Sequence, residues 1–459
     1  MILPQFFTTF EYANGKNMNL IQISFFITGI IIVGFFGLFA VTSIRESKPR
    51  SAIVATMTFL IFCLLWFGIY FYLNISNTAM LSAVGIILIF TLLLFLPLGT
   101  RKALEIGAVS DRVDERDVIF AREEYKPGTE KYDRYYAMRP GKKEIDDRLR
   151  KLPELLEPGG RLYDSIQSEH ISHIFAVIEG MLDKVDGPVN PNRHVIDPDE
   201  MTDIIKDLTI DLGAVEVGIA ELNPKWVYSH VGRGPEKWGV PIANNHKYVI
   251  PFTVEMDYAH VETAPDLPIT EESATSYLFG ANISIALASY IRSLGWPARA
   301  HMAGSNYQIM LPPVAHDAGL GELGRMGYLI SPQLGARVRL GAVTTDLPLL
   351  TDEPISFGVQ DFCERCLKCA ENCPSGAIPF GSKTDVRGVL KWQLNIEKCL
   401  HYWRMMGTDC GLCMKVCPYS HPEALVHDIT RTAIKRSVVA RQLAVWADDL
   451  FYGRKAKYL

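Results

Sequence analysis

The sequence predicts an α+β protein with three N-terminal transmembrane helices, a mixed α/β region and a small cysteine-rich domain. Two long stretches without a charged residue, 20–44 and 51–100, open the chain of 459 residues. Beyond about residue 155, helical periods alternate with short apolar runs, as in mixed α/β domains. Eight of the nine cysteines then lie between residues 363 and 417. A chain of this length has room for roughly two or three domains.

The uncharged stretches hold three spans of about 20 residues each, the length with which an α-helix crosses a bilayer. We expect these spans near residues 20–43, 52–73 and 79–98. A cleaved signal peptide has one short apolar core, so three successive spans predict a membrane anchor. Because no charged side chain lies within them, they offer no proton path. The spans could still contact a quinol or a partner subunit, although a plain anchor is the simpler interpretation.

Basic residues follow the first and third spans, whereas the turn after the second span, residues 74–78, carries no charge. By the positive-inside rule, both basic ends lie in the cytoplasm. No twin-arginine pair precedes the spans. We therefore expect a multi-pass protein of the inner (cytoplasmic) membrane whose catalytic part faces the cytoplasm. The basic residues are Arg45, Lys48, Arg50, Arg101 and Lys102.

Composition divides the chain into five expected parts. They are a membrane anchor at 1–100, a charged connector at 101–154, a mixed α/β domain at 155–350, a cysteine-rich domain at 351–430 and a helical tail at 431–459. Within the α/β domain, apolar residues recur at helical spacing over residues 273–294, and Gly295 stands where that helix would stop. Shorter runs at 169–182, 214–220 and 248–254 supply further elements.

The cysteines form two runs with the spacing of iron–sulfur ligands. The runs are Cys363-x2-Cys366-x2-Cys369-x3-Cys373 before Pro374, and Cys399 followed by Cys410-x2-Cys413-x3-Cys417 before Pro418. In two-cluster ferredoxins the fourth cysteine of each run binds the other cluster. This pattern predicts one [4Fe–4S] cluster on Cys363, Cys366, Cys369 and Cys417, and a second on Cys373, Cys399, Cys410 and Cys413. Structural zinc is the alternative, and two interleaved runs closed by Cys-Pro disfavour it.

One glycine-rich segment matches the dinucleotide fingerprint G-x-G-x-x-G, with glycines at Gly319, Gly321 and Gly324. The fingerprint requires an apolar strand before it, but prolines and polar residues precede this one, so nicotinamide binding is disfavoured. We expect a glycine-lined backbone that approaches another flat ligand. The net charge of −5 gives no basic field for nucleic acid.

Two blocks of the sequence resemble the reductive dehalogenase family. They are AGLGELGRMGYLISPQLGARVRLGAVTTDLP at residues 318–348, and residues 362–378 with their CAENCPSGAI ending. The resemblance covers roughly residues 155–430, and epoxyqueuosine reductases look similar over the same blocks. It implies a base-off corrinoid of the cobalamin type in a nitroreductase-like α/β domain, joined to a bacterial ferredoxin-like domain with two [4Fe–4S] clusters. The three glycines would then allow close approach to the corrinoid.

The chain departs from the usual dehalogenase in two respects. Typical respiratory members carry a twin-arginine export signal and use a separate anchor protein, whereas here three spans are fused to the catalytic chain. The sequence also lacks D-x-H-x-x-G, the usual source of a histidine below cobalt.

The resemblance also implies roles for three side chains. The family places a tyrosine at the start of a helix ahead of the block that reads YIRSLGW at residues 290–296, and the matching residue looks like Tyr277. A phenol has a pKa near 10, so a cation must help it lose its proton. The family's basic residue matches Arg325, and Asn306 would orient the substrate. The plainer alternatives are helix packing for Tyr277, binding of a corrinoid amide or an acidic side chain for Arg325, and a loop role for Asn306.

The implied function is reductive carbon–halogen cleavage of an organohalide by a membrane-anchored enzyme. Electrons would pass through the two clusters to the corrinoid cobalt. Partners would be the substrate, membrane lipid and an electron donor, which could be a quinol, a ferredoxin or a membrane redox partner, and no nucleic acid is expected. Two alternatives remain: a corrinoid reductase of the epoxyqueuosine reductase type, and a membrane iron–sulfur electron-relay protein without a corrinoid.

Overall fold

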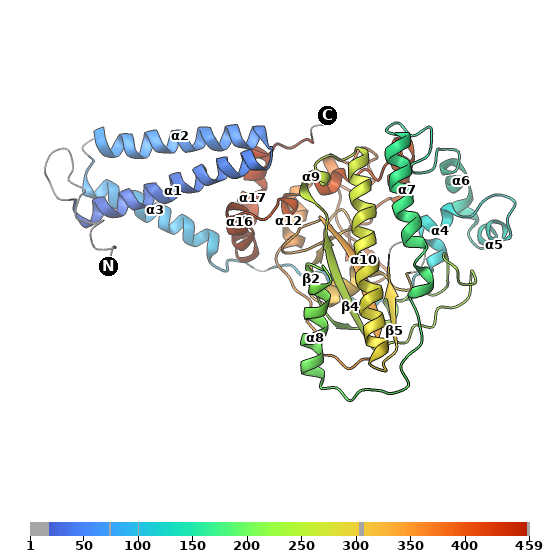
Figure 1. The fold of residues 1–459 in the computed structure, drawn as a ribbon. Helices are drawn as coiled ribbons and strands as arrows, with labels where there is room; N and C mark the ends of the chain where they lie inside the picture. Colours follow the sequence, from blue (N-terminus) through green and yellow to red (C-terminus); the bar gives the residue numbers. More distant parts are fainter. Residues whose placement is uncertain (1–17, 73–74, 100, 303–306, 457–459) are drawn as a thin grey trace. The chain divides into compact units, whose positions relative to one another are not determined.

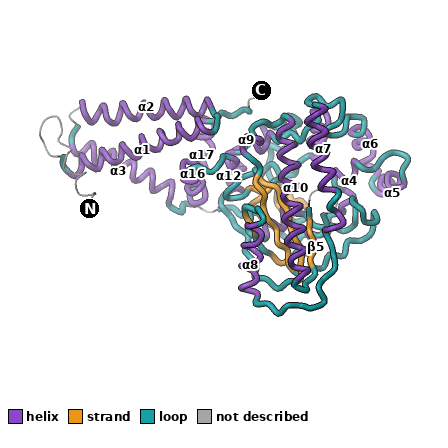
Figure 2. Tube along the Cα trace, in the orientation of Figure 1, coloured by secondary structure: helices purple, strands orange, loops and turns teal. Residues whose placement is uncertain are grey.

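A computed structural model describes residues 18–72, 75–99, 101–302 and 307–456 of the chain. The fold consists of two compact units. The first joins residues 1–100 to residues 423–454, and the second holds residues 101–422 and 455–459. Figure 2 shows that the strands belong to the second unit, where helices surround them.

The first unit contains three helices that are long and apolar enough to cross a membrane. They are α1 (Leu20–Arg45), α2 (Pro49–Tyr72) and α3 (Asn77–Phe95). Asn19 caps α1 through a reciprocal capping box with Gln22. The expected helices at 20–43, 52–73 and 79–98 are therefore present, with ends that differ by a few residues.

Aromatic packing joins α1 to α2. The rings of Phe25 and Trp66 stack with centroids 4.4 Å apart, and the Trp66 indole donates a hydrogen bond to the Phe25 carbonyl oxygen at 3.0 Å. Gly29 leaves the room that the Trp66 ring occupies, because a Cβ there would lie 2.2 Å from a ring atom. Two further helices, α16 (Leu425–Arg436) and α17 (Val438–Phe451), complete this unit (Figure 1).

The second unit is built on an antiparallel sheet in the order β2-β4-β8-β5, with β3 also paired to β4. Its strands are β2 (Glu216–Val217), β3 (Ala220–Glu221), β4 (Tyr248–Glu255), β5 (Ala298–His301) and β8 (Val338–Thr345). Strands β4 and β8 pair along their whole length, from Tyr248 opposite Thr345 to Glu255 opposite Val338. The expected mixture of helices and sheet is confirmed.

The long helix α10 (Leu267–Ser293) packs on β8, β5 and β4, and α7 (Ser165–Glu179) packs against α10 (Figure 1). Helix α8 (Pro198–Asp211) packs against β2. Buried Ile250, Leu287 and Val343 belong to the core between α10 and the sheet. Helix α10 begins at Leu267, six residues before the predicted start at residue 273. Pro268 is acceptable there, since the first turn needs no donor.

Short helices and strands surround this core. The connector supplies α4 (Ile119–Glu123), α5 (Glu130–Met138) and α6 (Pro140–Leu149). The α/β region adds α9 (Tyr258–Val261), α11 (Leu311–Asp317) and a hairpin of β6 (Glu322–Leu323) with β7 (Leu329–Ile330). The cysteine-rich region supplies α12 (Val359–Cys366), α13 (Lys368–Glu371), α14 (Ile396–Met406) and α15 (Leu412–Lys415). Strand β1 (Glu105–Ile106) of the connector joins β10 (Val389–Lys391) and β9 (Thr384–Val386) in a separate sheet.

Candidate active site

Short helices and tight turns position the cysteines. Cys363 and Cys366 lie on α12, and the left-handed residue Leu367 (φ 57°) turns the chain so that α13 begins at Lys368, with Cys369 as its second residue. Helices α13 and α15 pack against each other, which brings the two cysteine runs together. Every cysteine that the structure describes is free of disulfide bonds.

The electrostatics divide the thiols into two groups. Burial raises the pKa of Cys369 well above its ordinary value, and Cys363, Cys417 and Cys366 raise it further, with Cys413 a more minor neighbour. The structure thus brings the first predicted set of four together. Their role as iron ligands stays a prediction.

Cys413 has the corresponding surroundings in the second set. Burial raises its pKa well above the ordinary value, and Cys410, Cys399 and Cys373 add to the effect. A buried thiolate is costly without a cation beside it, whereas a bound iron supplies that charge. The donor set of each group therefore fits a four-iron cluster.

Tyr277 lies on the first half of α10, facing the sheet. The guanidinium carbon of Arg339, on β8, lies 5.0 Å from the centroid of the Tyr277 ring. Arg339 also donates a hydrogen bond to the Ser273 hydroxyl and lies 3.5 Å from a carboxylate oxygen of Asp409. Burial would lower the pKa of Arg339, but Tyr277 and Asp409 raise it above its ordinary value. A charged guanidinium is therefore held against the phenol.

Asp409 connects this pair to the second cysteine set. Its carboxylate accepts a hydrogen bond of 2.6 Å from the Ser273 hydroxyl, and its backbone N–H donates to the Thr270 hydroxyl at 3.1 Å. Cys410 follows Asp409 directly. Asp409 therefore contacts both α10 and Arg339, immediately before Cys410 of the second set.

Three further tyrosines, Tyr228, Tyr307 and Tyr328, are half-buried in this part of the second unit, as Arg339 is. Burial raises the pKa of Tyr307 well above the ordinary value, and the neighbouring Tyr277 adds to that effect. Tyr307 is therefore a neighbour of the Tyr277–Arg339 pair.

Tyr328 lies between Arg339 and the second cysteine set. Burial raises its pKa well above the ordinary value, followed by the effects of Cys413 and Cys399. Arg339 opposes that shift, so both the guanidinium and the second cysteine set are neighbours of Tyr328.

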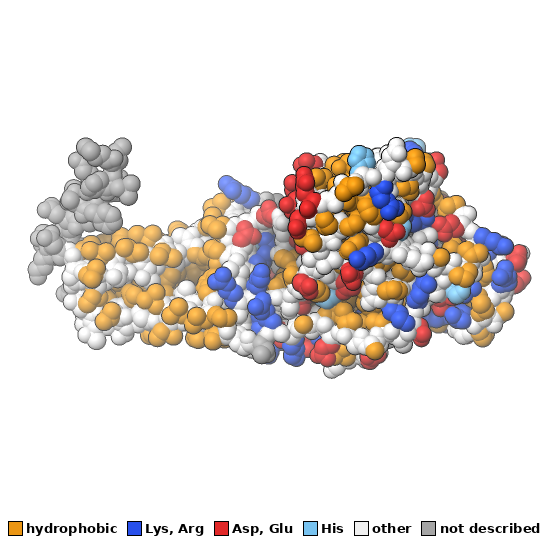
Figure 3. All heavy atoms as spheres, turned by 90° about the horizontal axis from the view of Figure 1, so that it is seen from below, with side chains coloured by type: hydrophobic (Ala, Val, Ile, Leu, Met, Phe, Trp, Pro, Cys, Tyr) orange, Lys and Arg blue, Asp and Glu red, His pale blue; other side chains and the backbone are white. Residues whose placement is uncertain are grey.

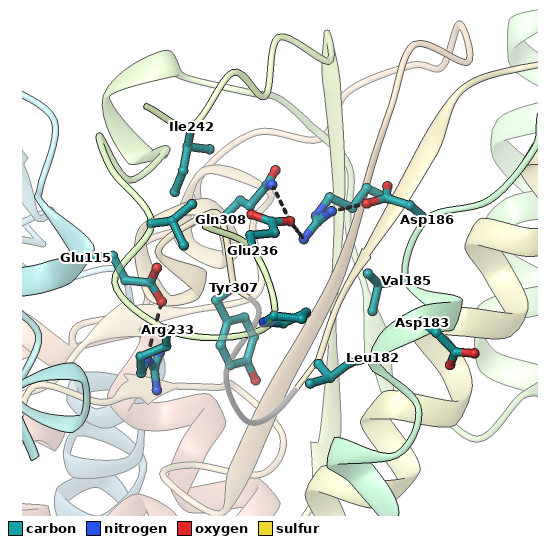
Figure 4. Close-up of a pocket in the computed structure, with 13 residues that line it drawn as sticks. Glu115, Leu182, Asp183, Val185, Asp186, Arg233, Glu236, Ile242, Tyr307 and Gln308 are labelled. Atoms are coloured by element: carbon teal, nitrogen blue, oxygen red, sulfur yellow. Dashed lines mark hydrogen bonds and ion pairs between the residues drawn. The ribbon is translucent and has the colours of Figure 1, made fainter. Parts of the chain in front are cut away.

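A pocket of about 120 Å³ has Tyr307 in its lining (Figure 4). Its two guanidiniums are paired with carboxylates of the lining: Arg233 with Glu115 at 3.2 Å, and Arg299 with Glu236 at 2.9 Å. Apolar side chains complete the lining, among them Leu182, Val185, Val231 and Ile242. An engineered apolar cavity of roughly 150 Å³ binds benzene, so this pocket is of the size that holds a small organic molecule.

Arg325 lies elsewhere, at the first cysteine set. Its guanidinium donates hydrogen bonds to the carbonyl oxygens of Cys363 at 3.0 Å, Pro379 at 2.8 Å and Gly381 at 3.0 Å. Its carbon lies 4.5 Å from the centroid of the Trp392 ring. The structure therefore places Arg325 as a support of the cysteine loops.

Sequence reasoning did not single out Arg339, the guanidinium that the structure places beside Tyr277. The block at 318–348 offers two arginines near its apolar strand, Arg337 directly before β8 and Arg339 within it. Arg337 hydrogen-bonds to the carbonyl oxygens of Ser420 and Met256, so Arg339 is the one that faces α10.

The three glycines lie close to other segments of this chain. A Cβ on Gly319 would lie 2.7 Å from the Glu353 carbonyl oxygen, and one on Gly321 would lie 2.2 Å from that of Ile330. Gly324 packs against the Ile330 side chain. The close approach that the structure shows is thus to protein backbone and side chains. Asn306 lies outside the described residues.

Comparison with known proteins gives three results at the level of sequence. A family model described as a 4Fe-4S dicluster domain matches residues 362–421. The tetrachloroethene reductive dehalogenase of Sulfurospirillum multivorans is 34% identical over 306 residues, which cover 58% of this chain and 60% of that protein. The epoxyqueuosine reductase of Escherichia coli is 25% identical over 291 residues, covering 56% of this chain and 75% of that protein.

One comparison concerns solved structures. A reductive dehalogenase whose structure was described with a mechanism for B12-dependent dehalogenation superimposes with a TM-score of 0.62 at 26% identity, covering 78% of this chain and 49% of that one. The chain thus spans about half to three fifths of the length of the dehalogenases that it matches. These similarities confirm the resemblance inferred from the two sequence blocks.

Proposed function

We propose, from its homology to the reductive dehalogenases, that this chain removes halide from an organohalide with the help of two [4Fe–4S] clusters and a corrinoid. The observation that carries the proposal is the pairing of Tyr277 with Arg339 at 5.0 Å, next to Tyr328, which neighbours the second cysteine set. A proton donor, a cation and an electron entry point are thereby brought to one place.

We infer a corrinoid-binding hollow beside the Tyr277–Arg339 pair, because unsatisfied polar atoms lie there. Among the described residues, Arg339 Nε and Asp409 Oδ1 are buried without a hydrogen-bond partner. A buried polar atom without a partner costs about 1–3 kcal/mol, so a ligand with amide groups would satisfy both. We place the corrinoid in a nitroreductase-like α/β domain, held by the faces of Tyr277, Tyr307 and Tyr328.

A corrinoid bound here would supply the reduced cobalt that carbon–halogen cleavage requires. The reaction takes two electrons and one proton, and yields a carbon–hydrogen bond and a halide ion. Tyr277 donates the proton from its hydroxyl to carbon, and Arg339 stabilises the phenolate that remains. A positioned proton donor contributes typically about 10²–10⁴-fold to a rate.

The positions of the cysteines suggest the order of electron transfer. Tyr328 is a neighbour of Cys399 and Cys413 of the second set, whereas Arg325 supports Cys363 of the first. We infer that the second set holds the inner cluster and the first set the outer cluster. Single electrons would then reach the hollow past Tyr328.

The pocket at Tyr307 is the proposed route for the substrate. Its volume of about 120 Å³ accommodates a small haloalkene or a single ring. Its lining carries four carboxylates (Glu115, Asp183, Asp186, Glu236) against two guanidiniums (Arg233, Arg299), which does not favour a polyanion such as tRNA. This surplus of acid disfavours the epoxyqueuosine reductase alternative.

We also propose that the three apolar helices anchor the enzyme in the inner membrane with its catalytic unit on the cytoplasmic side. Membrane lipid is then a partner, and a quinol, a ferredoxin or a membrane redox protein supplies electrons.

The test combines a metal count with an activity assay on purified protein. About eight irons and one cobalt per chain are expected, as two four-iron clusters and one corrinoid require. Reduced methyl viologen should drive halide release from members of a panel of haloalkenes and haloaromatics. Fully loaded protein that releases no halide from any of them would overturn the proposal, and iron without cobalt would favour an electron relay.

A further inference from the structure

Helix α17 is fastened to the ends of the apolar helices. At its start, the Ser437 hydroxyl donates to the Leu93 carbonyl oxygen at 2.7 Å, and the Val438 N–H donates to that of Leu98 at 3.1 Å. At its other end, the Arg50 guanidinium donates to the Leu450 carbonyl oxygen at 3.4 Å. These contacts all lie within the first unit.

The fastening points lie at one face of the membrane. Leu93 and Leu98 mark the C-terminal end of α3, and Arg50 opens α2, so successive antiparallel spans bring both to the same side. Phe451, at the end of α17, packs with Ala40 and Ala55 of α1 and α2. With 14 residues, α17 is shorter than the roughly 20 that a span needs, and it runs across the bundle end.

One face of α17 is apolar and exposed. Leu443, Trp446 and Leu450 stand three and four residues apart, on one side of the helix, and are 36%, 63% and 39% exposed. The opposite face is buried and includes Arg441 and Asp448, with buried Ala440 and Phe451 on its flank. An exposed stripe of this kind needs an apolar environment outside the protein.

Basic residues lie around this stripe. Lys435 and Arg436 are exposed at the end of α16, and Arg45 and Arg50 are exposed at the span ends. Figure 3 shows hydrophobic atoms along the apolar helices and Lys and Arg atoms gathered at the end where α16 and α17 lie.

We propose that α17 is an interfacial helix whose Leu443–Trp446–Leu450 stripe is embedded among lipid headgroups, with the surrounding basic residues bound to anionic phospholipid. The stripe adjoins the apolar surface of the spans. It lies at the level of the span ends, which is the depth at which lipid headgroups meet acyl chains. Tryptophan is enriched at that depth, and lysine and arginine near a membrane surface attract anionic lipids. Lipid is favoured over a protein partner as the occupant of the stripe, because the spans beside the stripe are themselves surrounded by lipid.

The test uses the full-length protein in nanodiscs that contain lipids brominated either near the headgroup or deep in the acyl chain. The Trp446 signal is the difference in tryptophan fluorescence between the wild type and Trp446→Phe. We expect the shallow bromines to quench this signal at least twofold more than the deep ones. Trp296→Phe, a change in the second unit, is the matched control and should show no bromine-dependent difference.

A Trp446 signal that neither bromolipid quenches would overturn the proposal while leaving the membrane anchor intact, provided that alkaline carbonate fails to extract the protein. Extraction by carbonate would instead refute the anchor itself. For the anionic lipid, Lys435→Gln with Arg436→Gln should lower the phosphatidylglycerol that copurifies with the protein at least twofold. An unchanged lipid content in this variant would refute the charge part of the proposal.

Discussion

The guanidinium of Arg339 lies over the ring of Tyr277, with 5.0 Å between its carbon and the ring centroid. The two residues come from different elements, α10 and β8, and are held together by Ser273 and Asp409. This contact holds a cation where a phenolate would form. We therefore expect different effects when Tyr277 and Arg339 are replaced.

Replacing Tyr277 with phenylalanine should abolish halide release, because the ring stays but its proton is lost. We expect a fall of about 10²–10⁴-fold in kcat, the usual contribution of a positioned acid. Iron and cobalt contents should stay at wild-type levels. Tyr290→Phe, a change on the same helix, is the control and should keep full activity. A Tyr277→Phe enzyme with wild-type turnover would exclude this proton donor.

Arg339 and Arg325 should differ in what their loss affects. Arg339→Gln removes the cation beside the phenol, so we expect kcat to fall by about 10²-fold while the iron content stays constant. Arg339→Lys keeps the charge and should recover part of that rate.

Arg325→Gln is the matched comparison. It removes three hydrogen bonds to carbonyl oxygens of the cysteine region, so iron content should fall with activity. If Arg325→Gln lost turnover with full iron and Arg339→Gln did not, the roles would be the reverse of those proposed.

The two cysteine sets should lose their clusters separately. Cys366→Ser should remove the first cluster and Cys413→Ser the second, so each variant should retain about four of the eight irons. The spectrum of reduced protein in electron paramagnetic resonance should show a different remaining cluster in each. Iron content that is unchanged in either variant would refute the ligand assignment.

The stability of the second unit should fall in mild acid because of two buried histidines. Burial lowers the pKa of His301 well below its ordinary value, with Arg299 and His246 adding to the effect, and burial also lowers that of His246. Both rings bond to the Thr344 hydroxyl, at 3.0 Å from His301 and 2.9 Å from His246.

A histidine whose folded pKa is depressed binds more protons when unfolded, so stability rises with pH across the interval between the two values. Its contribution is complete above a pH of about 6.5, the unfolded pKa, and is lost as pH falls below it. Thermal unfolding of the protein should therefore occur at a lower Tm at pH 5 than at pH 7.5. His301→Gln should reduce this difference, whereas exposed His194→Gln should not. An unchanged pH dependence in His301→Gln would contradict the assignment.

Local patterns were enough to predict the spans and the cysteine groups. The spans could be predicted from hydropathy, because a helix that crosses a bilayer must be long and apolar regardless of the rest of the fold. The cysteines follow from spacing, because a cluster fixes how far apart its ligands can lie along a short loop. The mixed helices and sheet followed from periodicity, apart from the first turn of α10.

The Arg339 contact could not be predicted, because it depends on the register of β8 beneath α10. A shift of one residue would have presented Arg339 to the other face of the sheet. The role of α17 was equally hidden: its sequence is that of an ordinary amphipathic helix, and only its bonds to Leu93 and Leu98 reveal where it lies. The glycines at 319–324 show close approach to the chain itself, and a close approach to a ligand requires the same residue type, so the sequence alone could not distinguish the two.

The pairing of β1 with β10 bears on how a water-soluble version of this enzyme should be cut. Residues just after the last span are bound to the cysteine region: the Arg101 guanidinium donates to the Ser356 carbonyl oxygen at 2.9 Å, and Glu105 pairs with Leu390. The far end of the chain returns as well, since the Lys455 ammonium donates to the Glu371 carbonyl oxygen at 2.7 Å. A truncation begun at residue 110 would strip an edge strand and expose β10, whereas a start at residue 101 combined with a short bridge across 423–454 would keep both attachments.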